Sequence, residues 1–146
     1  MAKTTTIPNV QNANMPDGSI LPADTTSKKT IFTAGANDSI LRSLGASSTD
    51  TSDRLINLYV NVGGAGTDRL VATISIPLNS GNSATIPAVD ILRALTGSSY
   101  LIPQLAYDAY GNKVWNLKAG TTVKVACTTT VTTAKEIDFF GDGADF

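Results

Sequence analysis

Hydrophobic and polar side chains alternate along two neighbouring segments near the middle of the chain. Apolar residues recur at every second position from Ile56 to Val62 and again from Leu70 to Leu78. A period of two is typical of strands that bury one face. The intervening residues 63–68 are rich in glycine, which favours a turn. The pattern therefore predicts a β-hairpin whose apolar face is covered by the rest of the chain.

The first 27 residues have a different character. They contain three of the six prolines, and their apolar residues are isolated from one another. Prolines at this spacing exclude a long helix and interrupt strand pairing. We expect residues 1–27 to form an extended N-terminal arm, either disordered or docked on an adjacent subunit, and residues 28–146 to form one β-sandwich domain. The candidate docking residues are Ile7, Val10, Ile20 and Leu21.

Other short apolar runs are separated by turn residues, which predicts further strands. The first two runs are joined by a Gly/Asn/Asp segment, so we expect a hairpin or a tight corner there. Arg42 interrupts the alternation of the second run, and Cys127 falls on the apolar face of a later one, as a small buried residue. The runs cover residues 30–33, 39–46, 100–102, 114–117, 121–131 and 135–140.

One segment carries helix signals. Pro87 suits a first helical position, Val89 and Leu92 fall on one side, and Gly97 lies where a C-terminal cap belongs. Asp90 near the start complements the helix dipole. We expect a helix of about two turns beginning at Pro87.

About eight short strands and one short helix predict an all-β fold, an antiparallel β-sandwich. Jelly-roll-like connectivity is favoured over the immunoglobulin form because the chain lacks a Cys…Trp…Cys pattern. A length of 146 residues is sufficient for one domain with its own core.

Composition narrows the classes of function. Charged residues make up 16% of the chain and the net charge is −1, so we expect neither a nucleic acid nor a membrane as partner. The absence of histidine excludes Ser-His-Asp and Cys-His catalysis, and one cysteine cannot form an intrachain disulfide. Asp50 and Asp53 lack a recognisable Ca²⁺ spacing, so a solvated loop is the preferred interpretation. We expect no enzyme, no catalytic residue, no bound metal and no cofactor.

Membrane and secretion signals are not evident in the sequence. No apolar run approaches the roughly 18 residues of a membrane-spanning helix. The first residues lack the apolar segment of a signal peptide. We therefore expect synthesis in the cytoplasm.

Aromatic residues are densest between residues 100 and 115. Tyr107, Tyr110 and Trp115 there suit three roles: a buried core, a protein interface or a platform for a sugar. Phe146 ends an acidic tail and is a candidate for burial on a neighbour. With the four arm residues, these make up the candidate interface.

Several stretches together resemble a known family. They are the succession TIFTAGANDSILRSLGASSTDTSDRLINLYV, the segment IPLNSGNSATIPAVDIL, the element from Asp108 to Asn112, a Lys-Ala-Gly turn and the closing Asp-Gly-Ala-Asp-Phe. Over residues 30–146 the chain is similar to head decoration, or cement, proteins of tailed bacteriophages. These patterns carry no chemical signature, so no functional residue is transferred.

The resemblance implies a structural virion protein. It would be a β-sandwich that binds the major capsid protein as a homo-oligomer, a trimer or dimer, on the outer capsid surface. There it would bridge capsomers against the pressure of packaged DNA, after assembly in the host cytoplasm. The alternative is a phage tail or fibre component, or a glycan-binding β-sandwich module that uses the Tyr/Trp region.

Overall fold

The computed structural model describes residues 12–64, 66–95 and 105–146. The hairpin predicted in the middle of the chain is confirmed, since β5 (Arg54–Asn61) pairs antiparallel with β6 (Arg69–Ile76). Alternate apolar side chains of β5 from Ile56 to Val60 lie in the core. Val62 was expected to continue this face, but it is exposed because the strand has ended and the 3-10 helix η2 (Val62–Gly64) has begun.

The alternation in β6 is broken by a β-bulge. The register between β5 and β6 shifts at Val71, which has no residue of its own opposite it. Leu70 therefore lies opposite the outer-face residue Tyr59 and is 56% exposed, while Ile74 is buried. Leu78 follows the end of the strand and is 38% exposed. The expectation that both leucines share the buried face was wrong, because the bulge changes the phase at one end and the strand stops short at the other.

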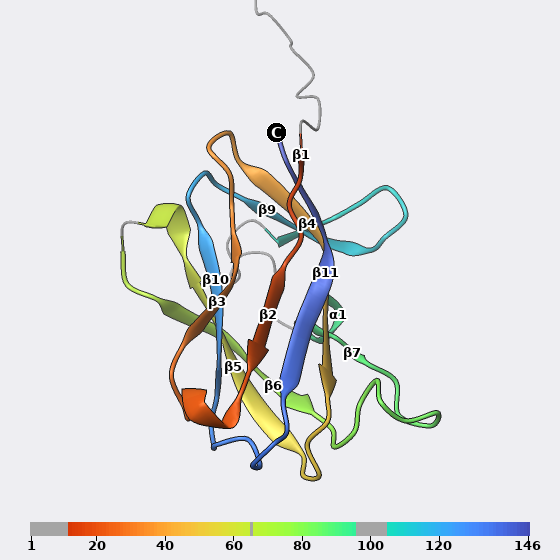
Figure 1. The fold of residues 1–146 in the computed structure, drawn as a ribbon. Helices are drawn as coiled ribbons and strands as arrows, with labels where there is room; N and C mark the ends of the chain where they lie inside the picture. Colours follow the sequence, from red (N-terminus) through yellow and green to blue (C-terminus); the bar gives the residue numbers. More distant parts are fainter. Residues whose placement is uncertain (1–11, 65, 96–104) are drawn as a thin grey trace, which may run out of the picture.

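Two antiparallel sheets face each other across the core (Figure 1). The smaller sheet has the strand order β3, β10, β5, β6. The larger has the order β1, β11, β4, β9, β8, with β2 also paired to β11 and β7 to β4. The bounds of these strands are β1 (Asn12–Ala13), β2 (Asp17–Ile20), β3 (Lys29–Thr33), β4 (Ser39–Ser48), β7 (Val89–Asp90), β8 (Leu105–Tyr107), β9 (Lys113–Leu117), β10 (Thr122–Cys127) and β11 (Ile137–Asp145).

Residues 12–20, here called the N-terminal strip, form part of the larger sheet. β1 pairs with the end of β11 and β2 pairs with its beginning, so the strip follows the edge of the sheet (Figure 1). Ile20 at the end of the strip is fully buried in the core. The strip is thus bound to its own chain, rather than disordered or docked on an adjacent subunit as expected. A short 3-10 helix, η1 (Pro22–Asp24), follows it.

β3 and β4 belong to different sheets, so the segment between them is a corner that crosses the sandwich. A second β-bulge lies in β4. Ser43 is opposite Asp142 and Leu41 is opposite Gly143, which leaves Arg42 as the extra residue. This explains the interrupted alternation in the sequence: the buried face passes from Leu41 to Leu44 across the bulge.

The predicted helix forms, but it is shorter than expected. α1 (Ile91–Ala94) has a single turn, and Asp90 caps it by accepting a hydrogen bond from the Arg93 amide over 3.0 Å. Val89 and Asp90 pair with β4, so the chain is extended where a first helical turn was expected. Ile91 and Leu92 are buried. The predicted strand at 100–102 and the predicted cap at Gly97 lie outside the described residues.

The described residues thus form an all-β antiparallel sandwich with eleven strands. The extra strands beyond the eight expected are short pieces such as β1 and β7, which have no readable alternation. Jelly-roll connectivity is not confirmed. A jelly roll has eight strands in two Greek keys, whereas here the sheets have four and seven strands, and the consecutive strands β5 and β6, and β8 and β9, pair as hairpins. None of the described helices is long and apolar enough to cross a membrane.

Candidate functional site

The two ends of the described chain meet at one end of the sandwich. Asn12 lies opposite Asp145 in the pairing of β1 with β11 (Figure 1). Phe146 follows Asp145, and its amide donates to the carbonyl oxygen of Asp38 over 3.2 Å. Residues 1–11 therefore join the sandwich beside its C-terminus. We call this region the terminal end.

Asp145 is the polar centre of the terminal end. Its Oδ1 accepts hydrogen bonds from Asn14 Nδ2 at 2.7 Å, from Ser39 Oγ and from the Gly35 amide at 3.3 Å. Burial by itself raises the pKa of Asp145, but the bonds from Ser39, Asn14 and Gly35 outweigh it, and the pKa lies below its ordinary value. The chain was expected to end in an exposed acidic tail. Instead, the Asp145 carboxylate connects β11 to the strip, to β4 and to the segment between β3 and β4.

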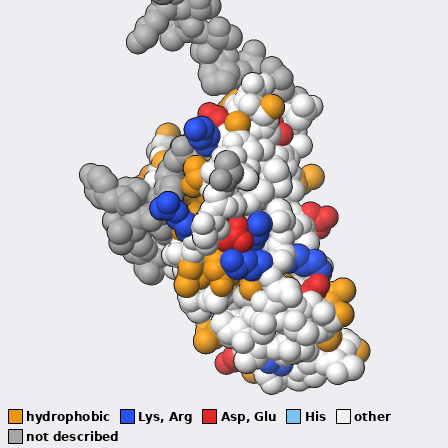
Figure 2. Space-filling view, turned by 90° about the vertical axis from the view of Figure 1, so that its left-hand side faces the viewer, with side chains coloured by type: hydrophobic (Ala, Val, Ile, Leu, Met, Phe, Trp, Pro, Cys, Tyr) orange, Lys and Arg blue, Asp and Glu red, His pale blue; other side chains and the backbone are white. Residues whose placement is uncertain are grey.

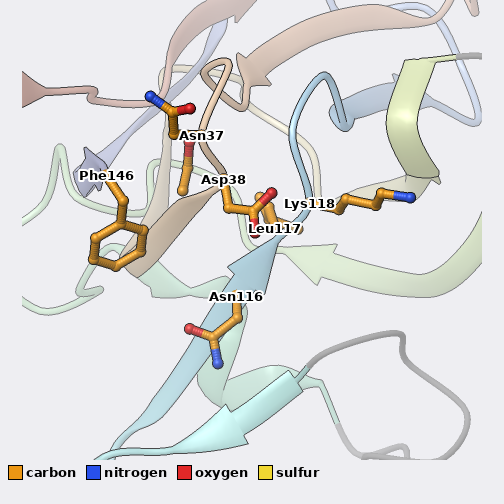
Figure 3. A pocket seen from close by; sticks show the side chains of 7 residues that line it. Asn37, Asp38, Asn116, Leu117, Lys118 and Phe146 are labelled. Atoms are coloured by element: carbon orange, nitrogen blue, oxygen red, sulfur yellow. The ribbon is translucent and has the colours of Figure 1, made fainter. Parts of the chain in front are cut away.

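A hollow of about 380 Å³ lies beside Phe146 at the same end (Figure 3). Phe146 is half-buried. Figure 3 shows its ring at one side of the hollow, with the Lys118 side chain pointing away from the ring. Five of the seven lining residues are polar in type, and Phe146 adds an aromatic contact point. The lining residues are Asn37, Asp38, Ser39, Asn116, Leu117, Lys118 and Phe146.

Two exposed tyrosines lie at the turn between β8 and β9, since Tyr107 is the last residue of β8 and Tyr110 is in the loop that follows. Tyr107 is 65% exposed and Tyr110 is 91% exposed. Asp108 holds the loop in shape, since its Oδ1 accepts from the amides of Tyr110 and Asn112, each at 2.8 Å. The Asn112 amide is the main cause of a pKa of Asp108 below its ordinary value. The turn thus presents two phenol rings to solvent on a fixed support.

A groove of about 740 Å³ lies next to this loop and carries both signs of charge. Two of its three cations are engaged by the protein itself: Arg42 pairs with Asp142 at 3.2 Å, and the Lys113 amine donates to the backbone carbonyls of Arg93 and Leu95. The third cation, Arg93, shares the groove with the carboxylates of Asp90 and Asp108, so the groove is not strongly selective for an anion. It is lined by Arg42, Ser43, Asp90, Leu92, Arg93, Tyr107, Asp108, Gly111, Asn112 and Lys113.

The structure separates the predicted interface residues into two groups. Ile20 and Trp115 are fully buried in the core, so an interface role is wrong for both, and for Trp115 the buried-core alternative is confirmed. Leu21, Tyr107 and Tyr110 are exposed, and Phe146 is half-buried. Ile7 and Val10 lie outside the described residues. Tyr107 ends β8 and lines the groove, whereas Phe146 follows β11 and lines the separate hollow at the terminal end, so the candidate residues do not form one continuous site.

Asp50 was expected in a solvated loop, but it is fully buried and paired with Arg54 at 2.8 Å. Its carboxylate also accepts from the amide and hydroxyl of Thr132 and from the Ser52 amide. Burial raises the pKa of Asp50, but the bonds from Arg54 and Thr132 prevail and hold it far below its ordinary value. In the sequence, only the spacing of four residues between Asp50 and Arg54 could have indicated this ion pair. The pair was missed because no apolar pattern marks the segment as buried.

The described residues contain no group of three or more His, Cys, Asp or Glu side chains able to hold a metal ion. Cys127 is a free, buried thiol, as its place in the strand pattern predicted. Comparison with known proteins gave no identification: no protein-family model matches the chain, and no curated protein matches it.

Proposed function

We propose that this protein is a structural virion component, a decoration or cement protein that binds the major capsid protein on the outer surface of a phage head and bridges neighbouring capsomers. The observation that carries the proposal is the pairing of Asn12 with Asp145 at the terminal end. It attaches residues 1–11, with Ile7 and Val10 among them, at a fixed point beside Phe146. A partner surface at this end would meet the arm and the C-terminal aromatic ring together.

The length of the attached segment suits bridging. Eleven residues span at most about 40 Å when fully extended, which is enough to pass from one small domain onto its neighbour. The strip resists a pull on this segment, because β1 and β2 are both paired to β11 and Ile20 is buried in the core. A load applied to the arm would therefore be transmitted to the sandwich.

Stabilisation of a shell by such a protein is a mass-action effect. A protein that binds the assembled shell but not its free subunits favours the assembled state by about 2.7 kcal/mol per site at a free concentration of 100 times Kd. No chemical step is needed. A net charge of −1 gives the protein little long-range attraction to nucleic acid or to an anionic membrane, which is consistent with a protein partner.

Co-sedimentation with undecorated heads tests the proposal. The wild-type protein should pellet with the heads, and the variant Ile7→Ser/Val10→Ser should remain largely in the supernatant. The matched control is Leu55→Ser/Val62→Ser, which removes two exposed apolar side chains that are not part of the arm and should bind normally. If the wild type stays in the supernatant, or if the arm variant binds as well as the control, the proposal is contradicted.

A second candidate function is a tail or fibre module that binds a glycan. The exposure of Tyr107 at the end of β8 and of Tyr110 in the turn that Asp108 stabilises favours it, because aromatic faces commonly contact sugars and other amphipathic ligands. Trp115 no longer contributes, since it is buried. A glycan array should show hits that are lost in Tyr107→Ala/Tyr110→Ala. An array without hits for the wild type would eliminate this candidate.

A further inference from the structure

β6 is an open edge of the smaller sheet. Among the described strands it pairs only with β5 and is the last strand in the order β3, β10, β5, β6. The edge of such a strand presents backbone N–H and C=O groups that can pair with another strand. The diagonal course of β6 across the sandwich is seen in Figure 1.

The other described edges are shorter or more interrupted than β6. β8 has only three residues, and the N-terminal strip is interrupted at Pro16 between two short strands. β3 carries a register shift and lies beside β2 of the strip. Short strands, prolines and bulges all discourage pairing at an edge.

β6 has eight residues and no proline, and its only charged residue is Arg69 at the first position. The bulge at Val71 lies near the start of β6, and from Ala72 to Ile76 the strand pairs with β5 without a register shift. This stretch is long enough for a ladder of backbone hydrogen bonds. β6 is therefore the described edge least protected against pairing.

We propose that a second copy of this chain pairs with β6 antiparallel, across a two-fold axis at Ile74 and perpendicular to the sheet. Such an axis keeps every side chain on its own face of the sheet, so residues opposite each other share a face. Ile74 then lies opposite Ile74 of the second copy, and Ala72 lies opposite Ile76. On the outer face, Thr73 lies opposite Ser75.

The sequence of β6 is complementary to itself in this register. The inner pairs are all apolar, and the outer pairs join hydroxyl groups, which stabilise cross-strand neighbours. The two Arg69 residues are about 33 Å apart along the strands, far beyond the screening length of about 8 Å. In this register, Leu70 of one copy lies near Leu78 of the other copy at each end of the ladder. Both leucines are exposed in the single chain.

Figure 2 shows a face of the molecule with basic side chains gathered beside acidic ones at its centre. On the outer face of the smaller sheet, Lys28 and Lys124 both pair with Asp68, at 3.2 and 3.0 Å, so two lysines share one carboxylate. This cluster carries one net positive charge in each copy, but none of its members lies in the stretch from Ala72 to Ile76 that forms the proposed ladder. A second copy is the proposed occupant because each pair in the register matches; a strand from another protein is an outcome that the test can reveal.

Sedimentation velocity over a range of concentrations tests the pairing. The wild type should form a dimer. Thr73→Lys/Ser75→Lys places two lysines opposite two lysines and should weaken the dimer about tenfold. Thr73→Lys/Ser75→Glu places lysine opposite glutamate at both points and should restore it. The matched control Thr128→Lys/Thr130→Lys adds the same charges at exposed positions after β10 and should leave the dimer unchanged.

A second measurement keeps the test decisive if the double-lysine variant fails to fold. Thr73→Cys/Ser75→Cys should give a covalent dimer under mild oxidation, because the two positions lie opposite each other across the axis. A wild type that is monomeric at its highest soluble concentration overturns the proposal and leaves the edge to another protein's strand. A dimer insensitive to both lysines, or a cysteine variant that stays monomeric on a non-reducing gel, overturns it as well. The pairing concerns the isolated protein, so its failure is distinct from a failure to bind phage heads.

Discussion

The side-chain amide of Asn14 donates a hydrogen bond to the carboxylate of Asp145 over 2.7 Å, although 131 residues separate them in the sequence. The same amide donates to the carbonyl of Thr33 at 2.9 Å. Asn14 thus connects the N-terminal strip to β11 in the larger sheet and to β3 in the smaller one. This contact fixes the strip near Asn12, the residue to which residues 1–11 are covalently joined.

Replacing this amide should loosen the strip. In Asn14→Ala, Asp145 loses one of its donors inside a partly buried site, which should cost about 1–3 kcal/mol of unfolding free energy. Hydrogen exchange followed by mass spectrometry should show faster exchange in residues 12–20 than in β5. Asn12→Ala, an exposed change on the same strip, is the control and should exchange like the wild type. Equal exchange in both variants would show that the strip is held by its backbone pairing alone.

Arg54 should be much more important for stability than an exposed arginine. In Arg54→Met the fully buried Asp50 loses its counter-ion, and breaking a buried pair costs about 3–5 kcal/mol. Arg42→Met breaks the exposed pair with Asp142 and should cost less than about 1 kcal/mol. Urea unfolding of the two variants measures the difference. Similar losses in both would mean that Arg54 does not compensate a buried charge.

Stability should fall as the solution becomes acidic. The bond from Lys124, with those from Asn61 and Lys28, lowers the pKa of Asp68 to about 2 from an ordinary value of 3.8. The unfolded chain therefore binds more protons between these values, so the contribution of Asp68 is complete above about pH 5 and is lost as the pH falls through 4 toward 2. Asp50 and Asp145 act in the same direction.

Lys124→Gln tests this assignment. It removes the largest cause of the low pKa of Asp68, so the unfolding free energy should depend less steeply on pH between 4 and 2. Lys135→Gln removes an equal charge from the segment before β11 and serves as the control. Urea unfolding at a series of pH values gives both slopes. An unchanged slope in Lys124→Gln would contradict the role given to Asp68.

The strands were predictable from the sequence where alternation was regular, and uncertain where a bulge intervened. β5 follows its apolar pattern, but Val71 and Arg42 each occupy the extra position of a bulge. A bulge depends on the partner strand, which the local sequence does not reveal. Leu70 was therefore assigned to the wrong face.

The candidate interface was predictable only in part, because an apolar residue has the same sequence signal whether it packs inside or outside. Ile20 and Trp115 are core residues, whereas Tyr107 and Tyr110 are exposed beside the turn that Asp108 stabilises. The role of Asp145 depends on Asn14 at the far end of the chain, a contact that no local pattern encodes.

The central claim, that the protein stabilises a phage head from outside, is tested most directly by the rupture temperature of undecorated heads mixed with increasing amounts of purified protein. The account predicts that the rupture temperature rises and saturates at a fixed ratio of protein to capsid subunits. Ile7→Ser/Val10→Ser should give a smaller rise. An unchanged rupture temperature at a large excess of the wild-type protein would contradict the account.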